Sequence, residues 1–147
     1  GDEIFPDGVD ENNPNITAGF LHFVDFSDLD NPVEVAKYEL PGQGSHNYWI
    51  EDDILYVAMY GGGVRVVAIS GELLGDLYRR GREIGYIITG SPNGYIPNAT
   101  MSWGAQLYKG YVFYSDWNTG LGSSKVSELK PDNSKANQYI NRTPIID

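Results

Sequence analysis

His46 is the residue of this sequence with the most versatile chemistry, because an imidazole can donate, accept or carry a proton near neutral pH. It begins the segment HNYWI, which brings an amide and an indole within three positions of the ring. Aromatic and polar residues are combined again in MSWGAQ and YSDW further along the chain. We therefore take six residues as candidates for binding a ligand or a partner: His46, Asn47, Trp49, Trp103, Asp116 and Trp117.

Catalysis by His46 would need a nucleophile or a carboxylate within reach of its ring. Ser45 precedes it directly, but neighbouring residues of a strand point to opposite faces, so the two side chains are not expected to touch. Asp116 could meet His46 only through the fold. We therefore predict no catalytic residues, and a hydrolase-type enzyme that uses His46 and Asp116 is the last of three functional alternatives.

Oxygen ligands suited to calcium gather near the N-terminus, at Asp7, Asp10, Glu11 and Asn13. Their spacing does not fit the twelve-residue EF-hand loop, and no Glu stands where its bidentate ligand belongs. A solvated acidic loop is the plainer interpretation, with calcium as its alternative. Elsewhere we predict no metal site and no cofactor, and we interpret His22 as a structural histidine among aromatic residues.

Three consecutive glycines at residues 61–63 could suggest a phosphate-binding loop. Such a loop must lead into a helix whose N-terminus faces the phosphate. These glycines lead instead into VRVVAIS, whose β-branched residues are typical of a strand. The sequence therefore predicts a hairpin turn here.

Composition restricts the partners and the fold class. The formal net charge is −10, and residues 1–36 contain nine acidic residues and no Lys or Arg, which argues against nucleic acid and anionic membranes. The chain has no Cys, which excludes disulfides and zinc–thiolate sites, and no run of about 20 apolar residues that could span a membrane. With 18 Gly, 8 Pro and 11 Tyr in 147 residues, short strands and many turns are favoured over helices. We predict an all-β fold.

Two further groups of residues are candidates for contact or modification. Arg79, Arg80 and Arg82 form the only basic cluster; they either pair with local acids or serve as a docking loop for an acidic segment. Three sequons mark candidate glycosylation sites at Asn15, Asn98 and Asn141, all in expected loops or tails.

Strand patterns cover most of the chain between residues 18 and 121. The segment AGFLHFVDFS is apolar on both faces, which predicts a strand packed between two sheets, whereas the more polar VEVAKYEL is expected at a sheet edge. Strands are predicted at residues 48–50, 54–60 and 64–69, joined by turns at 51–53 and 61–63.

Internal similarity appears at two spacings. A shift of 57 residues aligns Tyr56 with Phe113 and Gly63 with Gly120, and a shift of 43 aligns the segment that begins at residue 19 with the one that begins at 62. The two shifts differ by 14 residues, and the connectors differ by the same amount, which we attribute to an insertion at about residues 79–99. We infer a repeat of about four strands.

These segments carry a family resemblance. LHFVDFS with DNPVEVAKY resembles the LVIVD repeat, and SHNYWIEDDILYVAMYGGGVRVVAIS with MSWGAQLYKGYVFYSDWNTGL looks like the closing repeats of such bacterial proteins. The resemblance covers roughly residues 18–121 and departs after Leu121, where Gly122, Ser123 and Ser124 replace aromatic and aliphatic residues. It implies a β-propeller that is secreted, periplasmic or attached to the cell surface, with no settled biochemical activity.

The sequence thus predicts part of a propeller, with an extended acidic arm at 1–17, repeats of four-stranded antiparallel blades at 18–129 and a polar tail at 130–147. Two to three blades cannot close a ring, which takes four to eight. An open arc would expose the strand face of Leu55, Val57 and Met59, so we expect the rest of its own propeller or other subunits to cover it. The favoured function is structural or protein-binding and non-enzymatic; the alternative is binding of a small ligand or glycan by aromatic rings.

Overall fold

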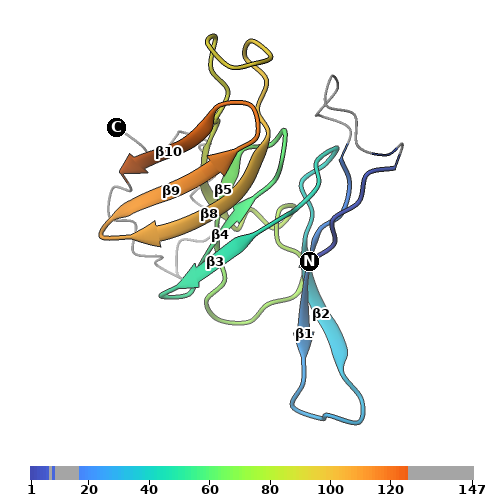
Figure 1. The fold of residues 1–147 in the computed structure, drawn as a ribbon. Coiled ribbons are helices and arrows are strands. Elements are labelled where there is room, and N and C mark those ends of the chain that lie inside the picture. Colours follow the sequence, from blue (N-terminus) through green and yellow to red (C-terminus); the bar gives the residue numbers. More distant parts are fainter. Residues whose placement is uncertain (7, 9–16, 126–147) are drawn as a thin grey trace.

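The fold is all-β, as the composition predicts. A computed structural model describes residues 1–6, 8 and 17–125, and these contain ten strands and no helix. The strands form three separate sheets, which we call the first, central and third sheets. Figure 1 shows them arranged one against the next, with the hairpin of the first sheet projecting away from the other strands.

The strands follow the chain closely from sheet to sheet. The first sheet contains β1 (Leu21–Asp25), β2 (Val33–Tyr38) and β6 (Gly75–Asp76), in the order β1-β2-β6. The central sheet is an antiparallel meander of β3 (Tyr48–Glu51), β4 (Ile54–Ala58), β5 (Val64–Ala68) and β7 (Glu83–Ile87). The third sheet contains β8 (Ser102–Tyr108), β9 (Tyr111–Asp116) and β10 (Gly120–Lys125), again antiparallel.

The pairing register recurs between sheets. The β4–β5 ladder pairs Ile54 with Ala68, and the β9–β10 ladder pairs Tyr111 with Lys125, which is the same pairing 57 residues later. The β1–β2 and β5–β7 ladders also correspond, and each has its register shift at the same step, after Phe23 in one and after Val66 in the other. The spacings found in the sequence therefore correspond to equivalent hydrogen-bonding positions.

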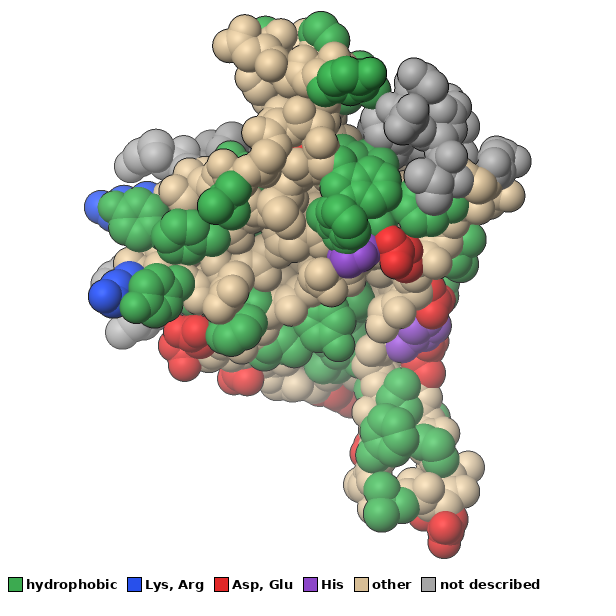
Figure 2. Space-filling view, in the orientation of Figure 1, with side chains coloured by type: hydrophobic (Ala, Val, Ile, Leu, Met, Phe, Trp, Pro, Cys, Tyr) green, Lys and Arg blue, Asp and Glu red, His purple; other side chains and the backbone are tan. Residues whose placement is uncertain are grey.

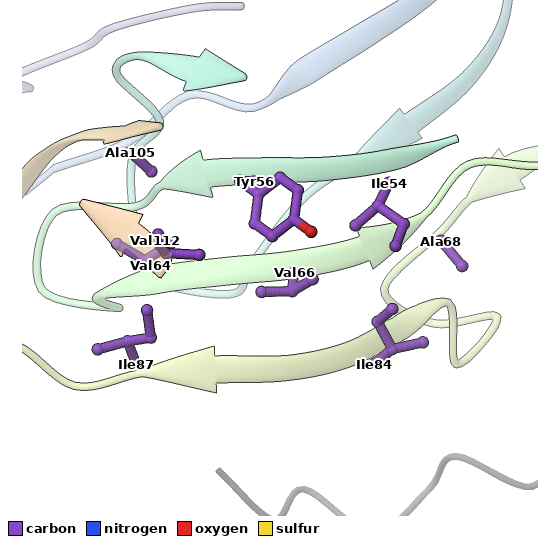
Figure 3. Close-up of a cluster of buried hydrophobic side chains, with 9 residues drawn as sticks. All are labelled: Ile54, Tyr56, Val64, Val66, Ala68, Ile84, Ile87, Ala105 and Val112. Atoms are coloured by element: carbon purple, nitrogen blue, oxygen red, sulfur yellow. The ribbon is translucent and has the colours of Figure 1, made fainter. Parts of the chain in front are cut away.

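Two apolar cores lie on opposite faces of the central sheet. Leu21, Ala36 and Tyr38 of the first sheet pack with Leu55 and Val57 on one face. On the other face, Ala105 and Val112 of the third sheet pack with β4, β5 and β7. Figure 3 shows this second cluster, in which Tyr56, Val64 and Val66 belong to the central sheet. Strand β4 is consequently buried at every position.

The expectation that Leu55, Val57 and Met59 would lie in water is wrong. Their exposed fractions are 1%, 0% and 0%, because the first sheet of the same chain covers them. Exposed apolar side chains occur instead at the two ends of the stack. Figure 2 shows hydrophobic side chains over the third sheet and along the projecting hairpin. They include Tyr108, Tyr111, Phe113 and Leu121 at one end and Val24, Phe26, Leu29 and Val33 at the other.

Three further expectations need correction. The segment at residues 79–99 is not wholly an insertion, because β7 lies within it and forms the fourth strand of the central sheet. Strand β2 is not at an edge, since β6 pairs with it in parallel on the side away from β1. Strand β1 is covered on one face only, and His22 and Val24 on its other face are exposed.

The turns form where the sequence places them. Asp52 and Asp53 both have positive φ, which a two-residue hairpin turn between β3 and β4 requires. Gly63 has a φ of 75°, and the Gly63 N–H donates to the Tyr60 carbonyl within the turn that leads into β5. The glycine run is therefore a turn between strands. Strand β10 also forms, despite the small residues after Leu121.

The N-terminal segment pairs with the first sheet. The Asp2 N–H donates to the Phe20 carbonyl at 3.0 Å, and Ile4 and Ala18 form an antiparallel bridge. These bonds fix residues 2–4, which we had assigned to the extended acidic arm, beside the start of β1. The first turn of the chain thus brings Glu3 toward the central sheet, where it meets the candidate site.

Candidate functional site

Aromatic rings gather where the central and third sheets meet at the start of β3 and β8. The ring centroid of Trp103 lies 5.1 Å from that of His46 and 4.5 Å from that of Trp117, with both pairs edge-to-face. Tyr60 completes the group, 5.8 Å from His46 and 6.1 Å from Trp117, and Phe5 packs against Tyr60 at 5.4 Å. We call these five rings the rim cluster.

Backbone bonds between the two sheets position the rim cluster. Tyr60 and Ser102 form an antiparallel bridge, and the Asn47 N–H donates to the Trp103 carbonyl at 3.2 Å. The His46 N–H donates to the Ala58 carbonyl at 3.0 Å, which fixes the residue beside the end of β4. The rings therefore lie on backbone that is hydrogen-bonded across the junction of the sheets, and this holds them in defined orientations.

His46 is an acceptor in this cluster. The Trp103 indole N–H donates to His46 Nε2, so a neutral His46 ring carries its proton on Nδ1. That Nδ1 atom is buried and has no hydrogen-bond partner among the described residues. Glu3 Oε1 lies 3.4 Å from Nε2, which adds a carboxylate to the site. Figure 2 shows that both histidines of the chain lie beside acidic side chains.

Tyr60 links the N-terminal segment to the cluster. Its hydroxyl donates to Glu3 Oε1, while its side chain is fully buried. Burial, followed by the hydrogen bond to Glu3, raises the pKa of Tyr60 well above its ordinary value. Tyr60 therefore stays a neutral hydrogen-bond donor over the physiological pH range, which suits a structural role in the rim cluster better than proton transfer.

Asp116 lies apart from His46 in its interactions. Its Oδ2 accepts hydrogen bonds from the Thr89 hydroxyl and from the Met101 N–H, the latter at 2.7 Å. Its Oδ1 accepts from the N–H groups of Asn118 and Thr119 at 2.8 and 3.0 Å. Among the described residues, no hydrogen bond or ion pair joins it to His46, and Asp116 is 4% exposed. It caps the β9–β10 turn and fastens the loop before β8.

Asn47 and Trp49 belong to a neighbouring surface. They line an open groove of about 340 Å³ together with Tyr48 of β3 and with residues of the third sheet that include Gln106 and Phe113. Trp49 is 39% exposed, and its indole N–H donates to Glu51 Oε2 at 3.1 Å. No charged side chain lines this groove, although the chain carries a net charge of −10. The predicted binding residues therefore fall into two places, the rim cluster and the groove.

The three arginines do not act as one cluster. Arg79 is exposed and pairs with Asp76 Oδ2 at 3.2 Å, and the Arg80 N–H bonds to the Asp76 carbonyl. Arg82 turns inward, where its guanidinium donates to the carbonyls of Ala68 and Ser70. This favours the interpretation of local pairing over a common docking loop.

His22 has the partners expected of a structural histidine. Its Nε2 lies 2.8 Å from Asp2 Oδ2, its Nδ1 bonds to Glu34, and its ring lies against Phe20 with centroids 4.5 Å apart. The hydrogen bonds with Asp2 and Glu34 raise the pKa of His22 above its ordinary value. An imidazolium between two carboxylates thus joins the N-terminal segment to β1 and β2.

Other predicted sites are placed only in part. Asn98 is exposed in the loop before β8, where a glycan could be attached, whereas Asn15 and Asn141 lie outside the described residues. The expected calcium ligands Asp7, Asp10, Glu11 and Asn13 lie outside them too. Within residues 1–6, 8 and 17–125, no group of three or more His, Asp or Glu side chains could hold a metal ion. The same part of the chain has no helix that is long and apolar enough to cross a membrane.

Sequence reasoning did not find Glu3, Phe5 and Tyr60 as members of the site. The 57-residue spacing could have found two of them, because Glu3, Tyr60 and Trp117 are successive positions at that spacing, as are His46 and Trp103. The rim cluster therefore consists largely of equivalent positions from adjacent sheets.

A scan of family models, a search of curated proteins and a search of solved structures each found no match for the chain.

Proposed function

We propose that this chain is a non-enzymatic segment of a β-propeller that serves as a structural or protein-binding module. The observation that carries the proposal is the central sheet, a four-stranded antiparallel meander with another sheet packed on each face. Propeller blades have this strand number and are stacked in this way. The recurring register supports the assignment of the three sheets to successive repeats.

The contacts of the candidate residues favour a binding surface over a reaction centre. Asp116 uses both of its carboxylate oxygens to hold loops, and the high pKa of Tyr60 keeps it protonated. Trp117 is 41% exposed at the rim, where an aromatic ring can contact a partner. A secreted, periplasmic or cell-surface location belongs to the proposal and rests on the resemblance to LVIVD repeats. Fractionating the source cells and probing for the chain tests that location.

A photo-crosslinking experiment tests the binding role. A photoreactive phenylalanine analogue replaces Trp117 in the chain produced in its source cells. A matched control replaces Leu74, which is 51% exposed in the connection between β5 and β6. We expect a protein adduct from position 117 and none from position 74. An absence of protein adducts at position 117 would contradict the proposal.

The second candidate function is binding of a neutral glycan or other small ligand. It is favoured by the exposure of Trp117 beside Trp103 and by the uncharged groove that Tyr48 and Trp49 line. Aromatic faces combined with amide and hydroxyl groups suit the apolar faces and hydroxyls of sugars. Titration of the tryptophan fluorescence with neutral oligosaccharides tests it. A saturable change that Trp49→Ala or Trp117→Ala removes would support the ligand function, and constant emission at all concentrations would exclude it.

A further inference from the structure

We propose that the outer face of the third sheet is a docking surface for the first sheet of a second copy of this chain, an inference that rests on the propeller function proposed above. We call this surface the bare face. It carries exposed side chains from all three strands: Gln106, Tyr108, Tyr111, Phe113, Ser115, Leu121, Ser123 and Lys125. Apolar and aromatic side chains dominate it, and Leu121 is 81% exposed.

Equivalent residues of the central sheet show what such a face does. Tyr111, Phe113 and Leu121 occupy the positions of Ile54, Tyr56 and Val64, because the two pairs of strands share one register. The three residues of the central sheet are at most 8% exposed, since the third sheet packs over them. The same face of the third sheet is therefore built to receive the next sheet in the stack.

The groove lies where a strand of that next sheet would run. In the central sheet, β8 packs across β3 and β4. The equivalent path across the third sheet follows β8 and β9, and the groove is lined there by Gln106, Phe113 and Ser115. Its volume of about 340 Å³ offers space for the side chains of an incoming strand.

The first sheet has the chemistry to occupy this face. Its inner side packs on the central sheet through Leu21 and Tyr38, so the opposite side of the β1–β2 hairpin stays uncovered. That hairpin exposes Val24, Phe26 and Val33 for apolar contact. It also belongs to an acidic region, since residues 1–36 contain no Lys or Arg.

Charge favours the pairing of these two ends. Lys109 and Lys125 are the only basic residues at positions 101–125, and the single acid there, Asp116, is buried. The aromatic and basic end of one copy thus matches the apolar and acidic end of another. Electrostatic matching of this kind steers association and selects the partner.

Head-to-tail docking has a geometric consequence. The two surfaces differ, so the contact is heterologous and leads to a ring if the rotation closes, or to a filament if it does not. Each copy supplies three sheets, and two copies would supply six, which lies within the four to eight blades of closed propellers. We therefore expect a closed dimer with two equivalent contacts.

Analytical ultracentrifugation of the full chain over a hundredfold range of concentration tests the inference. The chain of 16.3 kDa should pass from monomer to twice that mass as its concentration rises. Phe113→Asp should keep it monomeric, because the docked state would bury the new carboxylate. Lys125→Glu should raise the dissociation constant about two- to fivefold at low salt, as expected for an exposed ion pair. The control Tyr95→Asp, at a site 86% exposed in the loop before β8, should dimerise like the unmodified chain.

Circular dichroism of each variant establishes that it is folded before its mass is interpreted. A dimer that Phe113→Asp leaves intact would overturn the inference, and so would a chain that stays monomeric at every concentration. Neither result overturns the propeller function, because crosslinking at position 117 and amide exchange in the central sheet test that function separately. A mixed complex with another protein at Phe113 in place of the dimer would likewise reject self-docking.

Discussion

Strands β4 and β9 occupy equivalent positions and have similar sequences, ILYVA and YVFYSD, yet they are buried to very different extents. Every residue of β4 is buried, whereas burial alternates along β9, with Tyr111, Phe113 and Ser115 exposed. The difference lies in what covers each sheet, since β4 has a sheet on both faces and β9 on one. Burial in this fold is thus decided by the neighbouring sheet more than by the strand's own residues.

The largest expected effect comes from truncating equivalent aromatic residues. Tyr56→Ala should destabilise the chain by about 3–5 kcal/mol, because it leaves a cavity between the central and third sheets. Phe113→Ala should cost about 1 kcal/mol, because its ring is 39% exposed in the single chain. Chemical denaturation at a concentration where the chain is monomeric measures both. Equal losses would contradict the comparison.

A second pair of variants compares equivalent glycines. Gly63 and Gly120 both have positive φ, at 75° and 85°. A methyl group at Gly63 would overlap the Ile87 carbonyl of β7, whereas none of the described atoms lies within contact of one at Gly120. Gly120→Ala should therefore cost only the conformational strain, about 1–2 kcal/mol, and Gly63→Ala clearly more. Thermal unfolding of the two variants checks the order, and a larger loss at Gly120 would reject it.

A third prediction concerns how the first sheet is fastened to the central sheet. The hydroxyl of Tyr38 donates to Glu83 Oε2 at 2.6 Å, and Arg65 pairs with Glu83 at 3.3 Å. Tyr38→Phe should cost about 1–3 kcal/mol, because a largely buried carboxylate loses a partner. The control is Tyr78→Phe, which removes a hydroxyl from a neighbouring ring that is not bonded to Glu83 in this network. A loss at Tyr78 as large as at Tyr38 would count against the role of this network.

The smallest effect is expected at His22, on the uncovered side of the first sheet. Because its pKa is raised in the folded state, protonated His22 stabilises the fold below the ordinary pKa of about 6.5. This stabilisation should disappear as the pH rises through the raised value. NMR titration of the ring and denaturation at several pH values measure the two effects. His22→Gln should remove this part of the pH dependence, and a ring that titrates below 6.5 would contradict the assignment.

Much of the local structure could be predicted from the sequence, because turns and alternation are local properties. The turn at Asp52 and Asp53, the glycine turn before β5 and the 57-residue spacing all follow from neighbouring residues. Strand β7 was assigned to an insertion because EIGYI contains glycine and follows an arginine-rich segment. Its place in the central sheet depends on pairing with β5, a contact that its own residues do not encode.

The candidate site could be predicted only in part, for the same reason. His46 and Trp103 were found from their types and spacing, and the structure places them in contact. Glu3 joins them only because residues 2–4 pair with the start of β1, which brings it to Tyr60 across 57 positions of sequence. The pairing of His46 with Asp116 failed because Asp116 serves the loops at Thr89 and Met101.

The central claim is that a sheet covers both faces of the central sheet and one face of the third. Amide hydrogen exchange resolved by residue, at a concentration where the chain is monomeric, tests it most directly. The account predicts the slowest exchange in β4 and β5 and distinctly faster exchange in β9 and β10, whose register is the same. Protection in β9 and β10 equal to that in β4 and β5 would contradict it.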